Sequence, residues 1–256
     1  MALIEIRFAS EVLGMQTSIN VIVPQKSTKG EIGIDNAAKD EKYKTLLLLH
    51  GLSDDNSIWL RRTSIERYAT ELGIAVVMPS AEKSFYTDMQ YGDKYYTYIS
   101  KEVLRIAREF LPLSDKREDT FVMGNSMGGY GAMKIAMKNP DLFEAAAGLS
   151  SVADIVDFMD GYPALRRVIF GEEEIPAEEN LFDIAESTSR NEVKPRILMI
   201  EGTRDFMYDT NIRLKEKFES LDYEYEYVEA PGGHTWGFWD KHTPYALEWL
   251  LNSVNK

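Results

Sequence analysis

The side chain with the clearest chemical potential in this sequence is Ser126. It is the third residue of GNSMG (124–128), a G-x-S-x-G pattern between an apolar, strand-like run and a segment with helical spacing. In that context the pattern is typical of a sharp turn that holds a serine in a strained conformation, with small residues two positions away on either side. Such a turn projects the hydroxyl outward and predicts a nucleophile. A glycine-rich loop with no catalytic role could have the same sequence. The prediction of a nucleophile therefore depends on finding a base and an acid elsewhere in the chain.

The base must be one of three histidines, His50, His234 and His242. A serine on this kind of turn is followed along the chain by its acid and then by its histidine, which leaves His234 and His242. His234, in APGGHTWGF, follows the last strand-like run, and its glycines suit a tight loop that presents a side chain. His242, in WDKHTP, fits a helix start or a surface position better. We therefore expect His234 to be the base, with His242 as the alternative and His50 as a structural residue that closes an apolar strand.

The acid is expected just beyond the end of a strand. In RILMIEGTRDFMYD (196–209), Asp205 follows the apolar run directly, whereas Glu201 still belongs to that run. Asp209 is the alternative acid, but it is better placed to begin the next helix as its N-cap. We expect Asp205 to orient the histidine.

Attack by a serine also needs hydrogen-bond donors for the oxyanion that forms. The Met127 N–H follows the serine at a predicted helix N-terminus, and Leu52 follows the buried strand that ends in LLLLHG (46–51). We expect the backbone N–H groups of Leu52 and Met127 to form the oxyanion hole. Trp59 and Trp236 each lie a few residues from one of the catalytic segments and are candidates for binding the substrate. This chemistry needs no metal ion or organic cofactor.

The elements that must position these residues follow from the hydrophobic pattern. Eight segments have the pattern of strands: 3–8, 17–23, 45–50, 74–79, 120–124, 144–150, 196–202 and 223–229. Five segments have helical spacing: 57–72, 94–111, 127–139, 210–222 and 243–256. Strands that alternate with helices predict an α/β fold with a mostly parallel sheet covered on both faces. The first two strands should pair antiparallel at one edge, and the polar stretch 24–44 should be an exposed loop.

One region departs from this alternation. Residues 151–195 contain short helical segments and the charged tract GEEEIPAEEN. This region is too long to be a simple loop between two elements of the fold. We expect a small, cap-like insertion that lies over the carboxyl edge of the sheet and belongs to one domain of residues 1–256.

Composition limits the classes of function. A formal net charge of −13 repels phosphate groups, so nucleic acid and anionic membranes are not expected partners. The absence of cysteine excludes disulfides, thiolate catalysis and cysteine-ligated zinc. The start MALIEIRFAS has no basic region followed by an apolar one, so it does not read as a secretory signal, and a cytoplasmic protein is expected.

Several motifs together resemble those of the esterase D group of α/β-hydrolases, and within it the bacterial tributyrin esterases. They are LLLLHGLSDDNSIWLRRTSIERYA, FYTDMQYGDKYYTYISKE, GNSMGGYGAMKIA, GTRDF and GGHTWGFWD, and the likeness runs from about residue 3 to residue 250. The resemblance implies a serine carboxylesterase for short-chain acyl esters. It also implies a triad of Ser126, Asp205 and His234, with the amides of Leu52 and Met127 as oxyanion hole.

The chain also departs from the pattern of this group. The S-formylglutathione hydrolases among its members carry cysteine near the H-G-L loop, where this chain has Ser53 and Asp54, and many relatives have histidine where Asn125 stands. S-formylglutathione hydrolysis, acyl transfer to another acceptor and peptide hydrolysis stay open as alternatives on the same residues. A non-catalytic binding protein is disfavoured, because such proteins typically lose a triad member. The resemblance also suggests a homo-oligomer.

Overall fold

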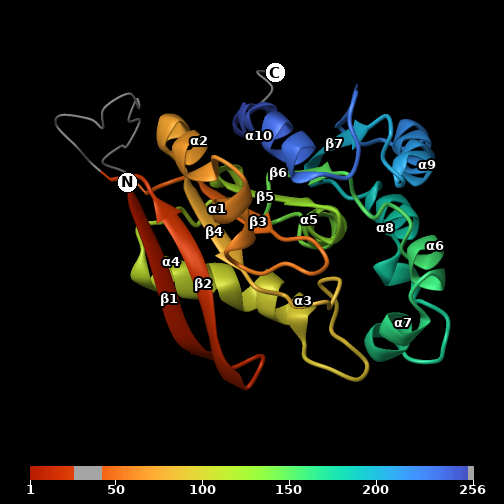
Figure 1. The fold of residues 1–256 in the computed structure, drawn as a ribbon, viewed down its shortest axis with the longest axis horizontal. Helices are drawn as coiled ribbons and strands as arrows, with labels where there is room; N and C mark the ends of the chain where they lie inside the picture. Colours follow the sequence, from red (N-terminus) through yellow and green to blue (C-terminus); the bar gives the residue numbers. More distant parts are fainter. Residues whose placement is uncertain (26–41, 253–256) are drawn as a thin grey trace.

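A sheet of eight strands forms the centre of the computed structural model, which describes residues 1–25 and 42–252 (Figure 1). All eight strands lie where the hydrophobic pattern predicts them: β1 (Ala2–Ser10), β2 (Met15–Val23), β3 (Thr45–Leu49), β4 (Ala75–Pro79), β5 (Thr120–Asn125), β6 (Ala145–Leu149), β7 (Arg196–Gly202) and β8 (Tyr225–Ala230). Their order in the sheet is β1-β2-β4-β3-β5-β6-β7-β8. The predicted loop 24–44 lies for the most part outside the described residues.

The directions of the strands agree with the sequence-based prediction. β1 pairs antiparallel with β2, and β2 with β4, while the strands from β4 to β8 in the sheet order run parallel. β3 and β5 are central, which explains their unbroken apolar runs, because both faces of a parallel sheet are covered. β8 lies at the far edge and alternates in sequence. The carboxyl ends of β5 and β7 therefore meet at one end of the sheet, where the predicted site residues follow.

Helices cover both faces of this sheet (Figure 1). Their bounds are α1 (Ile58–Arg62), α2 (Ile65–Leu72), α3 (Tyr95–Thr97), α4 (Leu104–Phe110), α5 (Met127–Lys138), α6 (Ile155–Asp160), α7 (Pro163–Phe170), α8 (Leu181–Thr188), α9 (Tyr208–Glu219) and α10 (Trp236–Leu251). A π-helical segment, Tyr98–Val103, joins α3 to α4. Among these helices none has the length and apolar character that crossing a membrane requires.

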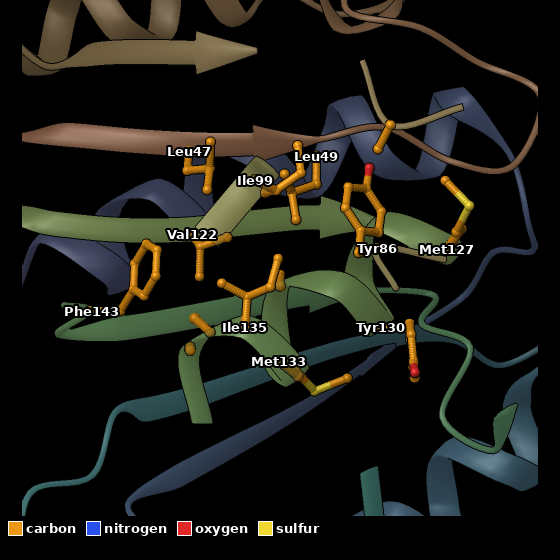
Figure 2. Packing of buried hydrophobic residues seen from close by; sticks show 14 of the residues in the cluster. Leu47, Leu49, Tyr86, Ile99, Val122, Met127, Tyr130, Met133, Ile135 and Phe143 are labelled. Carbon is orange, nitrogen blue, oxygen red and sulfur yellow. The ribbon is translucent and has the colours of Figure 1, made fainter. Parts of the chain in front are cut away.

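Two apolar clusters separate the faces of the sheet. Leu47 and Leu49 of β3 belong to the cluster that includes α4, α5, α8 and α9, whereas Leu46 and Leu48 belong to the cluster with α1, α2 and α10. Alternate residues of a strand point to opposite faces, so β3 contributes to both. Figure 2 shows side chains of β3 and β5 lying beside Ile135 of α5. This packing fixes the start of α5 against the end of β5.

Two predicted helices differ from the prediction in their bounds. The segment 57–72 forms two helices, α1 and α2, because Thr63 takes an extended conformation between them and the Ser64 N–H donates to the Asp240 carboxylate. The last helix begins at Trp236, seven residues earlier than expected, and runs through Pro244. Its N-cap is Thr235, whose hydroxyl accepts from the Phe238 N–H. Proline usually marks the beginning of a helix, but burial of this apolar helix against the sheet outweighs the hydrogen bond that Pro244 lacks.

Part of the predicted insertion, the helix α8, belongs to the layer of helices that covers the sheet. α8 packs against α5 and α9, so it is the covering helix between β6 and β7, and only α6, α7 and their links are additional. A buried ion pair joins this region to α5, with the Lys134 ammonium 2.6 Å from the Glu179 carboxylate. Burial lowers the pKa of Lys134 to about 8, against the raising effect of Glu179. The position of 151–195 over the active site stays a prediction.

Candidate active site

Ser126 lies between β5 and α5 with φ 55° and ψ −119°, a conformation that residues other than glycine rarely adopt. Three backbone hydrogen bonds hold it there: the Ser126 N–H donates to Leu149, and its carbonyl accepts from Tyr130 and Val152. Ser126 keeps 8% of its surface exposed at the end of the turn. Strain of this kind persists only where the surroundings enforce it, and it typically occurs at functional sites.

The glycines of the motif are required by the close approach of strand and helix. A Cβ added to Gly124 would lie 2.4 Å from the Gly128 carbonyl, and one added to Gly128 would lie 2.4 Å from the Leu49 carbonyl oxygen. Both obstacles are backbone atoms of the central sheet and its helix, which cannot move aside like a flexible side chain. The sequence-based interpretation of these two glycines agrees with the structure.

Gly128→Ala is accordingly expected to lower the free energy of unfolding by about 3 kcal/mol, the upper range for overpacking in a core. Denaturant unfolding measures this loss. The matched control is Gly237→Ala in the first turn of α10, where an added Cβ meets nothing within 4 Å. That variant should be neutral or slightly stabilised. Equal stability of the two variants would show that the elbow is not closely packed.

The three predicted polar side chains form one hydrogen-bonded series. His234 Nε2 lies 3.0 Å from Ser126 Oγ, and His234 Nδ1 lies 3.0 Å and 3.1 Å from the two oxygens of Asp205. The Asp205 carboxylate is buried, whereas the imidazole is partly exposed. This is the arrangement in which a histidine can remove a proton from serine while a carboxylate orients the ring.

Two neighbouring loops bring the acid and the histidine together. The Asp205 N–H donates to the Gly202 carbonyl and closes a tight turn at the end of β7. The N–H groups of Thr203 and Arg204 donate to the carbonyls of Ala230, the last residue of β8, and Gly232, in the loop that follows, at 3.0 Å and 2.8 Å. A Cβ on Gly202 would lie 2.8 Å from the Gly232 backbone, so only glycine permits this approach. The acid and the histidine are thus fixed relative to each other by backbone contacts.

The local environment keeps Asp205 charged. Burial pushes the pKa of this carboxyl upward, but hydrogen bonds from His234 and from the Met207 N–H outweigh burial, and the net pKa is lowered. A charged Asp205 accepts the Nδ1–H of His234, and this leaves Nε2 unprotonated and facing Ser126. The imidazole therefore has the tautomer that a general base requires.

The expected oxyanion donors lie on either side of this serine. Met127 is the first residue of α5, so its N–H is one of those at a helix N-terminus that have no acceptor within the helix. A Cβ on Gly51 would lie 3.7 Å from Ser126 Cβ, which places the loop that contains Leu52 beside the nucleophile. The geometry is compatible with donors from both residues.

His50 holds this loop in place. Its Nδ1 donates to the Gly51 carbonyl at 2.7 Å, and its Nε2 accepts from the Ala81 N–H at 2.9 Å. Burial lowers the pKa of His50, which keeps the ring neutral, as these two contacts require. The structural role predicted for His50 agrees with these contacts.

The alternative base and acid lie elsewhere. His242 is in α10, six residues or about 9 Å along the helix from Trp236, with its ring 4.5 Å from that of Phe238. Asp209 lies in the first turn of α9, whose N-cap is Met207, so the predicted N-cap role of Asp209 is wrong by two residues.

Trp59 has a different place from the one predicted. Only 1% of its surface is exposed, and its indole N–H donates to the Leu49 carbonyl, so it has no free face for a substrate. It forms the base of an aromatic series in which the ring of Trp236 lies edge-on to Trp59 and to Trp239, at 5.2 Å and 5.0 Å. Trp239 in turn lies 5.0 Å from the ring of His234. The tryptophans support the imidazole, and Trp236, which is partly exposed, remains the candidate for substrate contact.

Two residues, one beside His234 and one beside Asp205, had no role in the sequence-based prediction. The ring of Phe206 lies 4.6 Å from that of His234 and is 72% exposed, which is unusual for a large apolar side chain. Its only signal in the sequence is its position directly after the predicted acid. The second residue is Ser150, which follows β6 with φ 48°, accepts from the Trp239 indole at 3.0 Å and forms a hydrogen bond that lowers the pKa of Asp205.

Known proteins similar to this chain include esterases. The model of a family described as putative esterase matches residues 10–250. The chain is 32% identical to an acetyl esterase from Caldicellulosiruptor saccharolyticus over 267 aligned residues, which cover 98% of each chain.

Solved structures are similar over the same length. The fluorophosphonate-binding serine hydrolase F (FphF) of Staphylococcus aureus is 33% identical with a TM-score of 0.89, over 98% of this chain and 99% of that one. The S-formylglutathione hydrolase FrmB of the same organism is also 33% identical, with a TM-score of 0.86 and the same coverage. A ferulic acid esterase, 22% identical with a TM-score of 0.80, shares the fold.

Proposed function

The chain belongs to this esterase family and is a serine hydrolase of carboxylic esters, and on that premise we propose that it acts on short-chain acyl esters through an acyl-enzyme on Ser126. Its mostly parallel sheet flanked by helices is the α/β-hydrolase fold. The observation that carries the proposal is the hydrogen-bonded series from Ser126 Oγ through His234 to the Asp205 carboxylate.

In the first step Ser126 Oγ attacks the ester carbonyl carbon while His234 Nε2 takes the hydroxyl proton. The oxyanion of the tetrahedral intermediate accepts hydrogen bonds from the backbone N–H groups of Met127 and Leu52. One such donor is worth about 2.7–4 kcal/mol in a site that excludes water. Asp205 stabilises the imidazolium that forms.

The intermediate collapses when the carbonyl re-forms and the bond to the alcohol oxygen breaks. His234 gives its proton to the leaving alcohol, and the acyl group stays on Ser126 Oγ. In the second step His234 removes a proton from water, the resulting hydroxide attacks the acyl carbon, and Ser126 leaves with the proton returned by the imidazole. Atoms and protons balance without a cofactor.

Two observations favour a small acyl group. Ser126 is largely buried beside the backbone of Gly51, and the exposed ring of Phe206 stands against His234 at the surface. The similar acetyl esterase from Caldicellulosiruptor saccharolyticus also acts on a short acyl group, as its name states. Tributyrin and acetyl or butyryl esters of sugars and phenols are the substrates that this proposal includes.

A panel of p-nitrophenyl acetate, butyrate and octanoate tests this proposal, together with tributyrin, methyl ferulate and S-formylglutathione. We expect the highest kcat/KM for the acetyl or butyryl ester and a value at least about 10-fold lower for octanoate, because a long acyl chain has to be accommodated beside the largely buried Ser126. A steady rise with chain length would contradict the proposal. A strong preference for S-formylglutathione would instead favour the activity named for the Staphylococcus aureus neighbour FrmB.

A further inference from the structure

Glu201 is a buried acid that the mechanism above does not use. It is the second-last residue of β7, and only 1% of its surface is exposed. Its Oε1 accepts from the Gly202 N–H at 3.1 Å. Its Oε2 is buried, and the residues that the structure describes provide it with no N–H or O–H donor. A charged carboxylate in that position would be costly, because buried polar groups are normally hydrogen-bonded.

The group beside it is the carboxylate of the proposed triad. The turn closed by the Asp205 N–H and the Gly202 carbonyl folds Asp205 back toward the end of β7, near enough to Glu201 for its charge to raise the pKa of the Glu201 carboxyl. Two carboxylates this close cannot both be ionised, and Asp205 is held in its charged form by His234 and Met207. The proton therefore belongs to Glu201. Placed on Oε2, it satisfies that oxygen and gives Asp205 a further donor.

The neighbouring groups agree with a neutral Glu201. Burial, together with the charge of Asp205, raises the pKa of Glu201 to about 9. From β8, burial raises the pKa of Tyr227, so this phenol stays neutral in the pH range in which Glu201 titrates, and the exposed Glu229 accepts from the Tyr208 hydroxyl. Lys215 of α9 lies over the Tyr227 ring at 5.7 Å.

We propose that Glu201 is a positioning residue of the active site, whose neutral carboxyl donates a hydrogen bond to the Asp205 carboxylate and fixes it for His234. This inference rests on the proposed function of the triad. Asp205 is then held from three directions, by the Met207 N–H, by Ser150 and by Glu201, while His234 uses the remaining face. Loss of the donor lets the carboxylate turn and disturbs the imidazole.

The sign of the pH effect follows from this arrangement. Below a pH of about 9 Glu201 is neutral and donates. Above that pH it ionises, the hydrogen bond to Asp205 is lost, and two negative charges face each other. Activity should therefore fall as the pH rises through this range, and the fall should disappear when the side chain cannot ionise.

Two substitutions with side chains of similar size distinguish the loss of the hydrogen-bond donor at position 201 from a change in the shape of the side chain. Glu201→Gln keeps a donor and cannot ionise, so we expect kcat within about threefold of wild type at pH 7.5 and no alkaline fall. Glu201→Met keeps the length and removes the donor, so we expect kcat to drop about 10- to 100-fold with KM within about twofold, as for a misplaced catalytic group. Glu229→Met, an exposed neighbour on β8, is the control and should change neither value.

The measurements are kcat and KM for p-nitrophenyl acetate from pH 6 to 10.5, with the rate of Ser126→Ala subtracted and folding checked by thermal unfolding. A folded Glu201→Met variant with wild-type kcat, or a Glu201→Gln variant that keeps the alkaline fall, overturns the role of Glu201. An equal loss of kcat in both variants also overturns the role of Glu201, since it would show that the carboxyl is needed for the structure and not as a hydrogen-bond donor to Asp205. Residual wild-type turnover in Ser126→Ala would instead overturn the proposed function itself.

Discussion

Ser126→Ala is expected to abolish ester hydrolysis, with kcat lowered about 10⁴- to 10⁶-fold, the range seen when the nucleophile of a serine hydrolase is removed. The hydroxyl that forms the acyl-enzyme is lost, and His234 has no proton to accept. Alanine has the same Cβ as serine, so the strained turn should form as before. Turnover of p-nitrophenyl acetate and labelling by a fluorophosphonate probe measure the effect.

The matched control is Ser220→Ala at the exposed end of α9, which should keep wild-type turnover and labelling. Thermal unfolding of both variants should be close to that of the wild type. Wild-type turnover in a folded Ser126→Ala protein would exclude Ser126 as the nucleophile.

His234→Ala should have an effect of similar size, a loss of about 10⁴-fold or more in kcat, because His234 Nε2 is the base at hydrogen-bonding distance from Ser126 Oγ. His242→Ala is the comparison within the same chain. His242 packs on Phe238 inside α10, and its Nε2 forms no hydrogen bond with the described residues, so its loss should cost some stability and leave kcat within about threefold.

The two histidine variants are measured with the same short ester, and unfolding by denaturant accompanies each assay. An active His234→Ala together with an inactive, folded His242→Ala would reverse the assignment of the base. Exogenous imidazole offers a further check, since partial recovery of His234→Ala would indicate that the missing group is the ring itself.

The sequence predicted the sheet and the triad for the same physical reason. Unbroken apolar runs such as TLLLL require burial on both faces, and the loops at the carboxyl ends of parallel strands meet at one edge. The order of serine, acid and histidine along the chain then limits the candidates, and the positions of Asp205 and His234 in loops after strands favour them over Asp209 and His242. Neither inference needs a detail of packing.

What the sequence missed depends on contacts between distant segments. Pro244 indicates a helix start locally, and only the burial of Phe238 and Trp239 against the sheet extends α10 back to Trp236. Trp59 looks like a pocket residue by its distance from LLLLHG, yet its indole is enclosed in the core. The relation of Glu201 to Asp205 exists only because a turn folds the chain back on itself.

The buried ion pair of Lys134 and Glu179 limits which segments can be exchanged between this chain and other members of the family. Lys134 is fixed in α5 by the carbonyl of Phe85 and the hydroxyl of Thr87, and its charge is balanced from outside the helix, by the region that follows β6. Leaving one partner of such a pair alone in the interior costs about 3–5 kcal/mol. A chimera that takes 151–195 from a relative must therefore bring a carboxylate to position 179, or replace Lys134 at the same time. Exchanging residues 151–195 without this carboxylate would therefore destabilise α5, the helix that follows Ser126.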